Sequence, residues 1–133
     1  PTVKIVKNAT YDAMRASDLI LVASGTATLE AACLLTPMVV LYKLSRLSWW
    51  TARRFVNLES SALPNIVAGR RFVPELLQDE VEVERITSIA LDLLQDSEKR
   101  EEQRKALGKV RQQLGDSGAA ERTAELVLGY VES

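Results

Sequence analysis

The stretch "LILVASGTATLEAACLLTPMVV", Leu19–Val40, determines the fold that the sequence predicts. Two continuous aliphatic runs, of the type expected of strands covered on both faces, flank a short turn and an alanine-rich segment that Pro37 stops. We expect a strand, a helix and a second strand at residues 19–23, 27–34 and 38–42. Strand, helix and strand in such short order predict a crossover between parallel strands.

The flanking sequence extends this α/β pattern. Apolar spacing predicts a short strand, a helix that Thr10 caps, and a mostly helical segment from Val83 onward. We expect the strand at residues 3–6 and helices at residues 11–16, 97–114 and 119–131, with a break at 115–118. The fold class is therefore α/β, a Rossmann-like parallel sheet flanked by helices with a helical C-terminus, in one domain over residues 1–133.

Composition narrows the class of protein. The chain has 133 residues, of which 47% are hydrophobic, enough for one buried core. No apolar run reaches the length of a membrane span, and Lys4 and Lys7 occupy the place of a signal peptide's apolar segment. A single cysteine and no histidine leave no internal disulfide and no metal constellation, so we expect no metal site. Cys33 is expected to be a small buried hydrophobe.

Charge is distributed unevenly although the net charge is only −1. Residues 1–71 hold nine basic and four acidic residues, whereas residues 72–133 hold eight basic and fourteen acidic ones. A negatively charged ligand or surface would therefore meet the first half. Nucleic acid is not an expected partner, because the basic residues are scattered over different elements and have no aromatic stacking platform.

The turn Ser24-Gly25-Thr26, called the glycine turn below, has the chemistry of a phosphate site. It places backbone N–H groups and hydroxyls at the positive end of a helix dipole, and Gly25 lets a ligand approach the main chain. Glu30, about one turn later, can accept hydrogen bonds from the vicinal hydroxyls of a ribose. Spacing alone leaves the alternative open that the turn merely caps the helix and Glu30 lies in solvent.

Three blocks together resemble a known family: "SGTATLEAA" from Ser24, "TPMVVLYKLS" from Thr36 and "LPNIVAGRRFVPELLQ" from Leu63. They resemble lipid-A-disaccharide synthase, a bacterial glycosyltransferase of the GT-B fold, over almost the whole chain, and the third block is the most specific. The resemblance implies transfer of 2,3-diacylglucosamine from its UDP-activated form to 2,3-diacylglucosamine 1-phosphate, with release of UDP and without a cofactor. The chain would be part of the UDP-sugar donor-binding domain.

The resemblance also implies site residues. It assigns the UDP diphosphate loop to Ser24, Gly25, Thr26 and Thr28. It assigns the ribose contact to Glu30. Three further donor-site positions are Asn65, Arg70 and Gln78. In the third block Pro64 favours an extended approach to Asn65, whose amide offers a donor and an acceptor. Arg70 can present a bidentate fork that stabilises the charge growing on UDP as it leaves.

Alternatives remain open at these positions. Arg70 or Arg71 can instead form a surface pair with Glu75 or Asp79, and Gln78 is equally well read as an exposed residue. Leu35 departs from the family pattern, which usually has glycine before the Thr-Pro pair. Because leucine tolerates positive φ poorly, the preceding helix must end by another route or accept strain.

A second stretch, "LSRLSWWTARRF" from Leu44, mixes aromatic and basic residues. Trp49 and Trp50 with Arg53 and Arg54 suit the interface of an anionic membrane, and acyl-chain substrates would make such contact reasonable. The alternative is that the tryptophans pack into the domain or against a partner domain. With the resemblance, the first interpretation predicts a cytoplasmic protein peripherally associated with the inner membrane.

Members of the family are longer, and this chain resembles only the later part of their second domain. The acceptor site and the general base are expected in the first domain, so no residue here is predicted as the base and the isolated chain is expected to be inactive. Alternatives are a UDP-sugar epimerase, another GT-B transferase, and a non-catalytic nucleotide-binding or interaction module. Three arrangements stay open for the last helix: it packs locally, it contacts another domain, or it is exchanged between the subunits of a homodimer.

Overall fold

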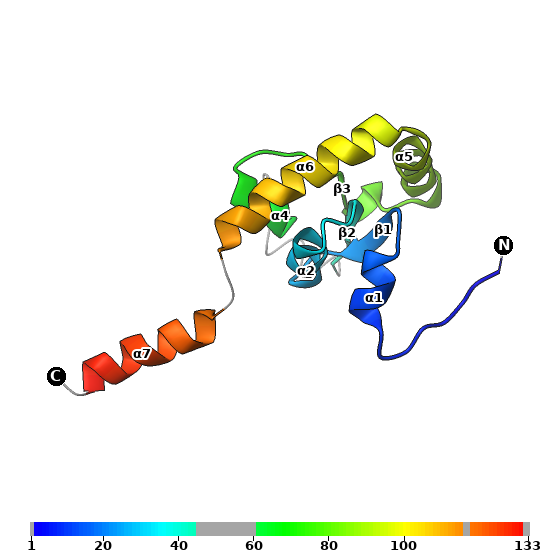
Figure 1. The fold of residues 1–133 in the computed structure, drawn as a ribbon. Helices are drawn as coiled ribbons and strands as arrows, with labels where there is room; N and C mark the ends of the chain where they lie inside the picture. The colour runs from blue at the N-terminus through cyan, green and yellow to red at the C-terminus, as the bar shows by residue number, and fades with distance from the viewer. Residues whose placement is uncertain (1, 45–60, 116–117, 132–133) are drawn as a thin grey trace.

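The computed structural model describes residues 2–44, 61–115 and 118–131. Its centre is a parallel sheet in the order β1-β2-β3, formed by Ile20–Ala23, Met38–Tyr42 and Glu75–Leu77. Ile20 pairs with Met38 across the first ladder, and Val40 pairs with Glu75 across the second. The α/β class and the parallel pairing around the quoted stretch are confirmed (Figure 1).

Helices precede, connect and follow these strands along the chain. They are α1 (Thr10–Arg15), α2 (Ala27–Cys33), α4 (Leu63–Ala68), α5 (Val83–Gln95), α6 (Ser97–Leu114) and α7 (Ala119–Val131), with a 3₁₀ turn, η1, at Gln78–Glu80. Strand β2 and helices α6 and α7 have the bounds expected from the sequence. These elements are marked by long apolar runs or by helical spacing, which are local signals.

Strand β2 is the centre of the core because its side chains alternate between the two faces of the sheet. Met38 and Val40 belong to one apolar cluster with Leu107 of α6. Val39 belongs to a second cluster with Leu93 of α5. Burying each of these side chains contributes about 1.5–3 kcal/mol, so α6 and α5 hold opposite faces of the same strand.

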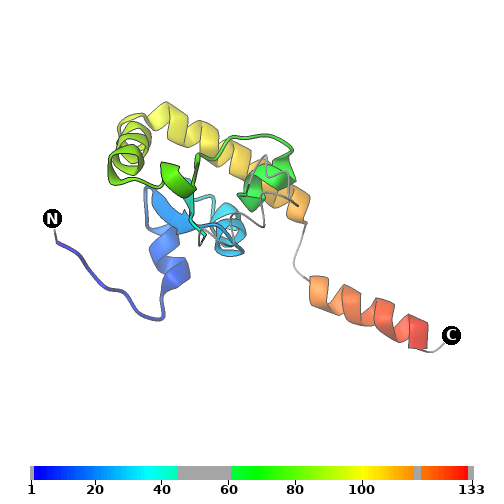
Figure 2. The ribbon, with the colours of Figure 1, turned by 180° about the vertical axis from the view of Figure 1, so that it is seen from behind.

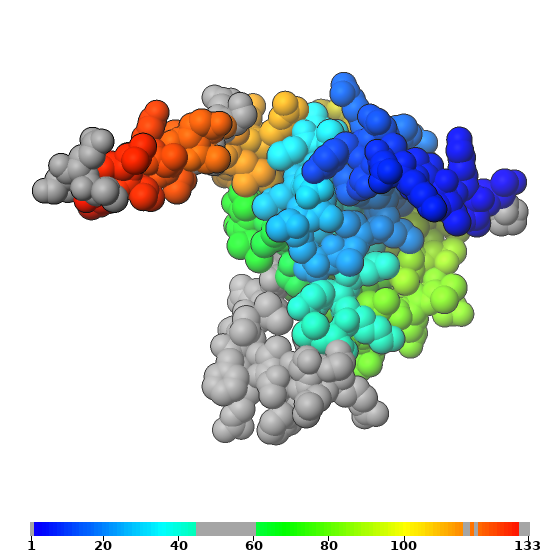
Figure 3. Space-filling model, turned by 90° about the horizontal axis from the view of Figure 1, so that it is seen from below, coloured from blue at the N-terminus to red at the C-terminus, as the bar shows by residue number. Residues whose placement is uncertain are grey.

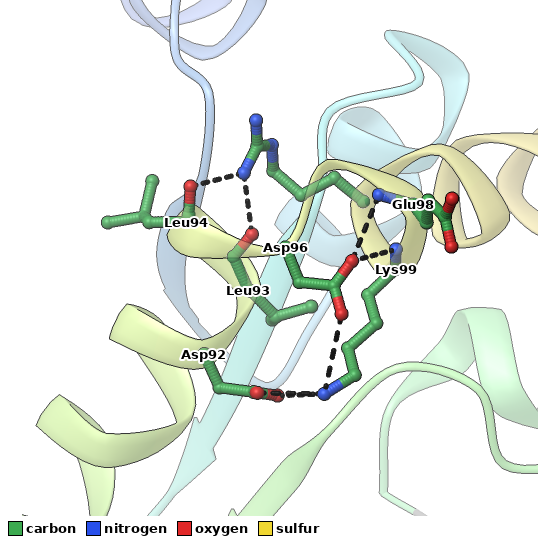
Figure 4. A network of polar contacts seen from close by, with 7 residues as sticks. Asp92, Leu93, Leu94, Asp96, Glu98 and Lys99 are labelled. Atoms are coloured by element: carbon green, nitrogen blue, oxygen red, sulfur yellow. Dashed lines mark hydrogen bonds and ion pairs between the residues drawn. The ribbon is translucent and has the colours of Figure 1, made fainter.

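A polar network joins α5 to α6 (Figure 4). Asp96 caps α6, its Oδ1 accepting hydrogen bonds from the backbone N–H of Glu98 and of Lys99, each at 3.0 Å. Lys99 Nζ reaches back to Asp92 Oδ1 at 2.7 Å, and Arg100 Nη1 donates to carbonyl oxygens in the last turn of α5. The backbone hydrogen bond from Lys99 lowers the pKa of Asp96, and the hydrogen bond to Asp92 raises the pKa of Lys99.

Two expectations for the first residues were wrong. Residues 3–6 form no strand, and Val3 and Ile5 are 87% and 82% exposed. The apolar pattern favours an extended chain, but a strand also needs a neighbour, and within the described residues this segment pairs with none. Helix α1 begins at Thr10 itself, with Ala9 as its N-cap and no side-chain cap hydrogen bond, so Thr10 does not cap it.

Two local expectations further along the chain were also wrong. The segment around Pro64 is the first turn of α4 and not an extended approach, because the φ of proline also suits the start of a helix. Cys33 is exposed and not buried. It is the last residue of α2, whose buried side is formed by Thr28, Ala31 and Ala32.

The end of α2 shows how the chain accommodates Leu35. The residue has a φ of 59°, in the left-handed region. Leu35 N–H donates to Ala32 O and Thr36 N–H donates to Ala31 O, each at 3.1 Å, which is the hydrogen-bond pattern of a Schellman motif. The helix therefore accepts the strain at leucine, whose side chain packs against the first apolar cluster.

Helix α7 lies apart from the other described elements (Figures 1 and 2), and Figure 3 shows it protruding from the body. Leu126, Leu128 and Tyr130 on it are exposed. No helix in the described part of the chain is long and apolar enough to cross a membrane. Residues 45–60, which include Trp49, Trp50, Arg53 and Arg54, lie outside the described residues.

Candidate functional site

The candidate site lies where the strands end, an edge that we call the carboxyl edge. Ser24 follows β1 directly, Lys43 follows β2, and Gln78 follows β3. Ligands of open parallel α/β sheets bind outside the carboxyl ends of the strands. The structure thus brings the glycine turn and Gln78 to the edge where such a ligand would lie.

The glycine turn lies between β1 and α2, where the sequence predicted it. Gly25 has a φ of 148°, and a side-chain carbon added there would meet nothing within 4 Å. Among the described residues, the backbone N–H groups of Gly25, Thr26 and Ala27 have no hydrogen-bond partner. Three consecutive donors at the start of a helix, beside open space, favour an anion.

The hydroxyls near this turn divide into two kinds. Ser24 Oγ donates to Ser61 O at 2.7 Å, and the fully buried Thr28 donates from Oγ1 to Gly25 O at 2.6 Å. Their protons therefore hold the backbone of the turn. Thr26 is exposed, and its hydroxyl has no hydrogen bond within the described part of the chain, so it is the hydroxyl that remains for a ligand.

Glu30 lies in the first turn of α2 and is half-buried. Its backbone N–H donates to Thr26 O at 3.1 Å, while its carboxylate makes no hydrogen bond or ion pair with any described residue. Its neighbour Ala31 is fully buried. The Glu30 carboxylate is therefore partly exposed to solvent and makes no polar contact with the described residues of the core.

Gln78 follows β3 and has a φ of 52°. With its amide oriented so that both atoms are satisfied, Gln78 Nε2 donates to Leu44 O at 3.2 Å and Oε1 accepts from Leu44 N at 3.0 Å. Gln78 thereby ties the ends of β3 and β2 together. Its backbone conformation is one that favours glycine or asparagine, which the sequence pattern did not indicate.

Asn65 is used inside the domain. It is 2% exposed, and its Nδ2 donates to Val73 O at 2.9 Å and to Glu75 Oε1 at 2.5 Å. Its Oδ1 accepts from the backbone N–H of Phe72 at 3.0 Å and of Val73 at 2.9 Å. Both amide donors and both acceptor positions are occupied, so Asn65 links α4 to the chain entering β3.

The sequence analysis considered Glu75 only as a surface partner of Arg70 or Arg71, and it did not single out Ser61. Glu75, the first residue of β3, accepts hydrogen bonds from Ser61 N, Ser61 Oγ and Ala62 N at 2.6, 2.9 and 3.0 Å, all on Oε2. The available signal was an acid inside the otherwise apolar block "FVPELL", because a half-buried carboxylate requires donors.

Arg70 lies elsewhere. It is exposed, its guanidinium stands over the Phe72 ring at 5.6 Å from the centroid, and it lines a cavity of about 570 Å³ together with Gln103. Gln103 bonds to Met38, the first residue of β2, so this cavity lies at the amino end of the sheet. The structure does not bring Arg70 to the glycine turn. Arg71 lines the same cavity.

Metal ligands do not gather in the described part of the chain: no three His, Cys, Asp or Glu side chains there could hold an ion. The chemistry at the carboxyl edge is that of backbone N–H donors, a hydroxyl and a carboxylate. Such groups bind a polar ligand through hydrogen bonds, with an anionic part at the helix start and hydroxyls at the acid.

A parallel sheet between helices, with a glycine turn at the carboxyl end of a strand, defines a Rossmann-like protein. The sequence matches the family described as lipid-A-disaccharide synthetase over residues 2–128, and the chain belongs to this family. The resemblance in the three sequence blocks is thereby confirmed, and membership of this family argues against an epimerase.

Named relatives agree with the family match. The lipid-A-disaccharide synthase of Anaeromyxobacter sp. (strain K) is 50% identical over 129 residues, which are 97% of this chain and 34% of the relative. The synthase of Syntrophus aciditrophicus (strain SB) is 42% identical over 132 residues, 99% of this chain and 34% of the relative. The chain spans about a third of the length of the curated relatives it matches.

Proposed function

We propose that this chain carries the UDP-sugar donor site of a lipid-A-disaccharide synthase. The reaction is transfer of 2,3-diacylglucosamine from its UDP-activated form to 2,3-diacylglucosamine 1-phosphate, giving the lipid A disaccharide and UDP. The observation that carries this proposal is the glycine turn at the carboxyl end of β1, whose three consecutive N–H groups have no partner among the described residues. Family membership supplies the substrate class.

Each residue at the carboxyl edge has a distinct role in this proposal. The N–H groups of Gly25, Thr26 and Ala27 bind the diphosphate, each charge-assisted hydrogen bond contributing about 1.5–3 kcal/mol. The Thr26 hydroxyl adds a donor, and the Glu30 carboxylate accepts hydrogen bonds from the ribose hydroxyls. Gln78 closes the edge between β2 and β3.

Two other residues of the expected donor set act from inside the domain in this proposal. Thr28 holds the carbonyl of Gly25, and Asn65 holds α4 against the chain entering β3. Their effect on the donor is through the shape of the site. The leaving-group role of Arg70 stays a prediction from the resemblance, and its place at the amino end of the sheet argues against it.

Calorimetric titration of the chain with UDP tests the donor site. We expect wild type to bind, and Glu30→Ala to lose roughly tenfold or more in affinity, because the ribose hydroxyls lose a charged acceptor. Glu84→Ala, an exposed acid in the first turn of α5, is the matched control and should bind like wild type. Absence of UDP binding by wild type, or equal binding by Glu30→Ala, would contradict the proposed site.

The membrane contact is a separate proposal from sequence. Trp49 and Trp50, with Arg53 and Arg54, would dock on an anionic inner-membrane surface, where the lipid acceptor is presented to a cytoplasmic, peripherally bound enzyme. Co-sedimentation with liposomes containing acidic lipids tests it. The double variant Trp49→Ser/Trp50→Ser should lower the bound fraction; an unchanged fraction would remove this proposal and leave the donor site untouched.

A homodimer is the remaining proposal about partners. Helix α7 carries apolar side chains, including Leu126 and Leu128, that are exposed to solvent. Sedimentation velocity of the chain compared with Leu126→Ser tests it. A single monomeric species for wild type at micromolar concentration would speak against dimerisation.

A further inference from the structure

Glu75 occupies a junction between two segments that are distant in sequence. Its Oε2 accepts three hydrogen bonds from Ser61 and Ala62, and its Oε1 accepts one from Asn65 Nδ2 at 2.5 Å. A carboxylate offers about four acceptor positions. The side chain of Glu75 therefore fixes the residues directly before α4 to the first residue of β3.

Ser61 passes this constraint to the glycine turn. Ser61 O accepts the hydrogen bond from Ser24 Oγ at 2.7 Å, although the two residues are 37 positions apart. Ser24 N–H donates to Leu41 O at 3.0 Å on β2, so Ser24 is held on one side by the sheet and on the other by Ser61. Any shift of Ser61 must move the hydroxyl partner of Ser24.

We propose that Glu75 is a positioning residue for the donor site: through Ser61 it sets the conformation of the glycine turn and thereby the affinity for the UDP diphosphate. The inference rests on the proposed function of the turn. Glu75 makes no contact with the ligand in this scheme. Glu75 is held in β3, where it pairs with Val40 of the central strand.

The chemistry of a carboxylate is needed at this junction. Donors face both Glu75 oxygens, from Ser61 and Ala62 on one side and from Asn65 on the other. A glutamine has one acceptor oxygen and one NH₂ group, so one side would face a donor with a donor. Glu75→Gln therefore keeps the size of the side chain and breaks one half of the junction.

The carboxylate also distinguishes the two helix starts near the carboxyl edge. The N–H groups of Ser61 and Ala62, directly before α4, are satisfied by an internal anion. The N–H groups of the glycine turn are not satisfied by any described residue. Among the described residues, N–H donors without a partner therefore lie at the glycine turn and not at Ser61 and Ala62.

The test compares Glu75→Gln with Glu84→Gln, an exposed acid of the same size on α5. Two-dimensional ¹H–¹⁵N spectra of the full chain report on the amides of Gly25 and Thr26, and calorimetry reports on UDP. We expect Glu75→Gln to shift both resonances and to weaken UDP binding roughly tenfold, within the usual range for coupled neighbours. Glu84→Gln should change neither. Unmoved resonances in Glu75→Gln would overturn the inference.

A double-mutant cycle with Ser24→Ala separates positioning from general stability. If Glu75 acts through Ser61 and Ser24, Glu75→Gln should weaken UDP binding much less in the Ser24→Ala background than in wild type. The decrease in Tm caused by Glu75→Gln should be similar in both backgrounds. An equal effect on affinity in both backgrounds would overturn the route through Ser24. Wild type that fails to bind UDP would refute the proposed function, whereas the Gly25 and Thr26 resonances would still decide the positioning.

Circular dichroism establishes that each variant is folded. Should Glu75→Gln not fold, Ser61→Ala takes its place, because it removes only the Oγ hydrogen bond to Glu75 and keeps both backbone N–H bonds. Ser61→Ala should shift the Gly25 and Thr26 resonances in a folded chain. Resonances identical to those of wild type would overturn the inference.

Discussion

Gln103 on α6 satisfies both backbone polar groups of Met38, the first residue of β2. Gln103 Oε1 accepts from Met38 N at 2.8 Å, and Gln103 Nε2 donates to Met38 O at 3.2 Å. The side chain is 4% exposed and Met38 is fully buried. This contact joins residues 65 positions apart and fixes the long helix to the central strand.

Replacing Gln103 by leucine should therefore destabilise the chain by about 2–4 kcal/mol, because two buried backbone groups lose their partner. Urea unfolding followed by circular dichroism measures the change. Gln112→Leu, an exposed position on the same helix, should stay within about 0.5 kcal/mol of wild type. Equal stability of the two variants would show that Met38 finds other partners.

Alanine should have opposite effects at two glycines that both have free space around them. Gly25 has a φ of 148°, so Gly25→Ala should cost about 1–3 kcal/mol and weaken UDP binding. Gly108 lies inside α6, where Gly108→Ala should stabilise by about 0.5–1 kcal/mol. Chemical denaturation of both variants checks this; a stabilising Gly25→Ala would mean that the turn does not need glycine.

At Leu35 a glycine substitution should destabilise the chain less than an alanine substitution, which is the reverse of the usual order inside a helix. Both variants lose the packing of the leucine side chain, but alanine keeps the strain of the left-handed conformation and glycine removes it. Leu35→Gly should therefore be more stable than Leu35→Ala by about 1 kcal/mol, measured by urea denaturation. The same pair of substitutions at the exposed helical position Lys105 should favour alanine.

The Asp96 cap should make stability depend on pH at the acidic end. Because the pKa of Asp96 is lowered below its ordinary value of 3.8, its stabilising contribution is present above that value and is lost as pH falls through the folded-state pKa. The pKa of Lys99 is raised, so its contribution is lost only as pH rises beyond the ordinary value of 10.5.

Asp96→Ala should thus lower Tm by a few degrees at about pH 6, and the difference from wild type should shrink as the pH falls below 3.8 toward about pH 2. Thermal melts at both pH values measure it. Glu102→Ala, an exposed acid later in α6, is the control and should show a much smaller difference at pH 6. A difference that does not decrease between pH 6 and pH 2 would mean that the cap does not act through its charge.

The glycine turn was predictable because each part of it is local. A buried apolar run before it, a proline after the helix and a glycine between hydroxyl residues are contiguous in sequence, and the structure has each element there. Glu75 was not predictable in the same way. Ser61 and Asn65 come within hydrogen-bond distance of Glu75 only because α4 folds back along the start of β3.

The position of Arg70 illustrates the same limit. Sequence places it next to the glycine that ends α4, in a block that resembles a donor site, and its chemistry suits a phosphate. The chain direction through α4 and into β3 decides that it lies at the amino end of the sheet instead, in the cavity that Gln103 also lines. The residue type indicated what Arg70 could bind, and the topology of the chain determined where Arg70 lies.

The sequence by itself determined the family, the parallel α/β class, strand β2, helices α6 and α7, and the place of the glycine turn between β1 and α2. These follow from periodicity and contiguous motifs, which act over a few residues. Only the tertiary structure decided that Asn65 is buried, that Glu75 holds Ser61, and that Val3 and Ile5 stay outside the sheet. The physical reason is that a hydrogen bond or strand pairing between distant segments depends on where the whole chain packs, and no local pattern encodes it.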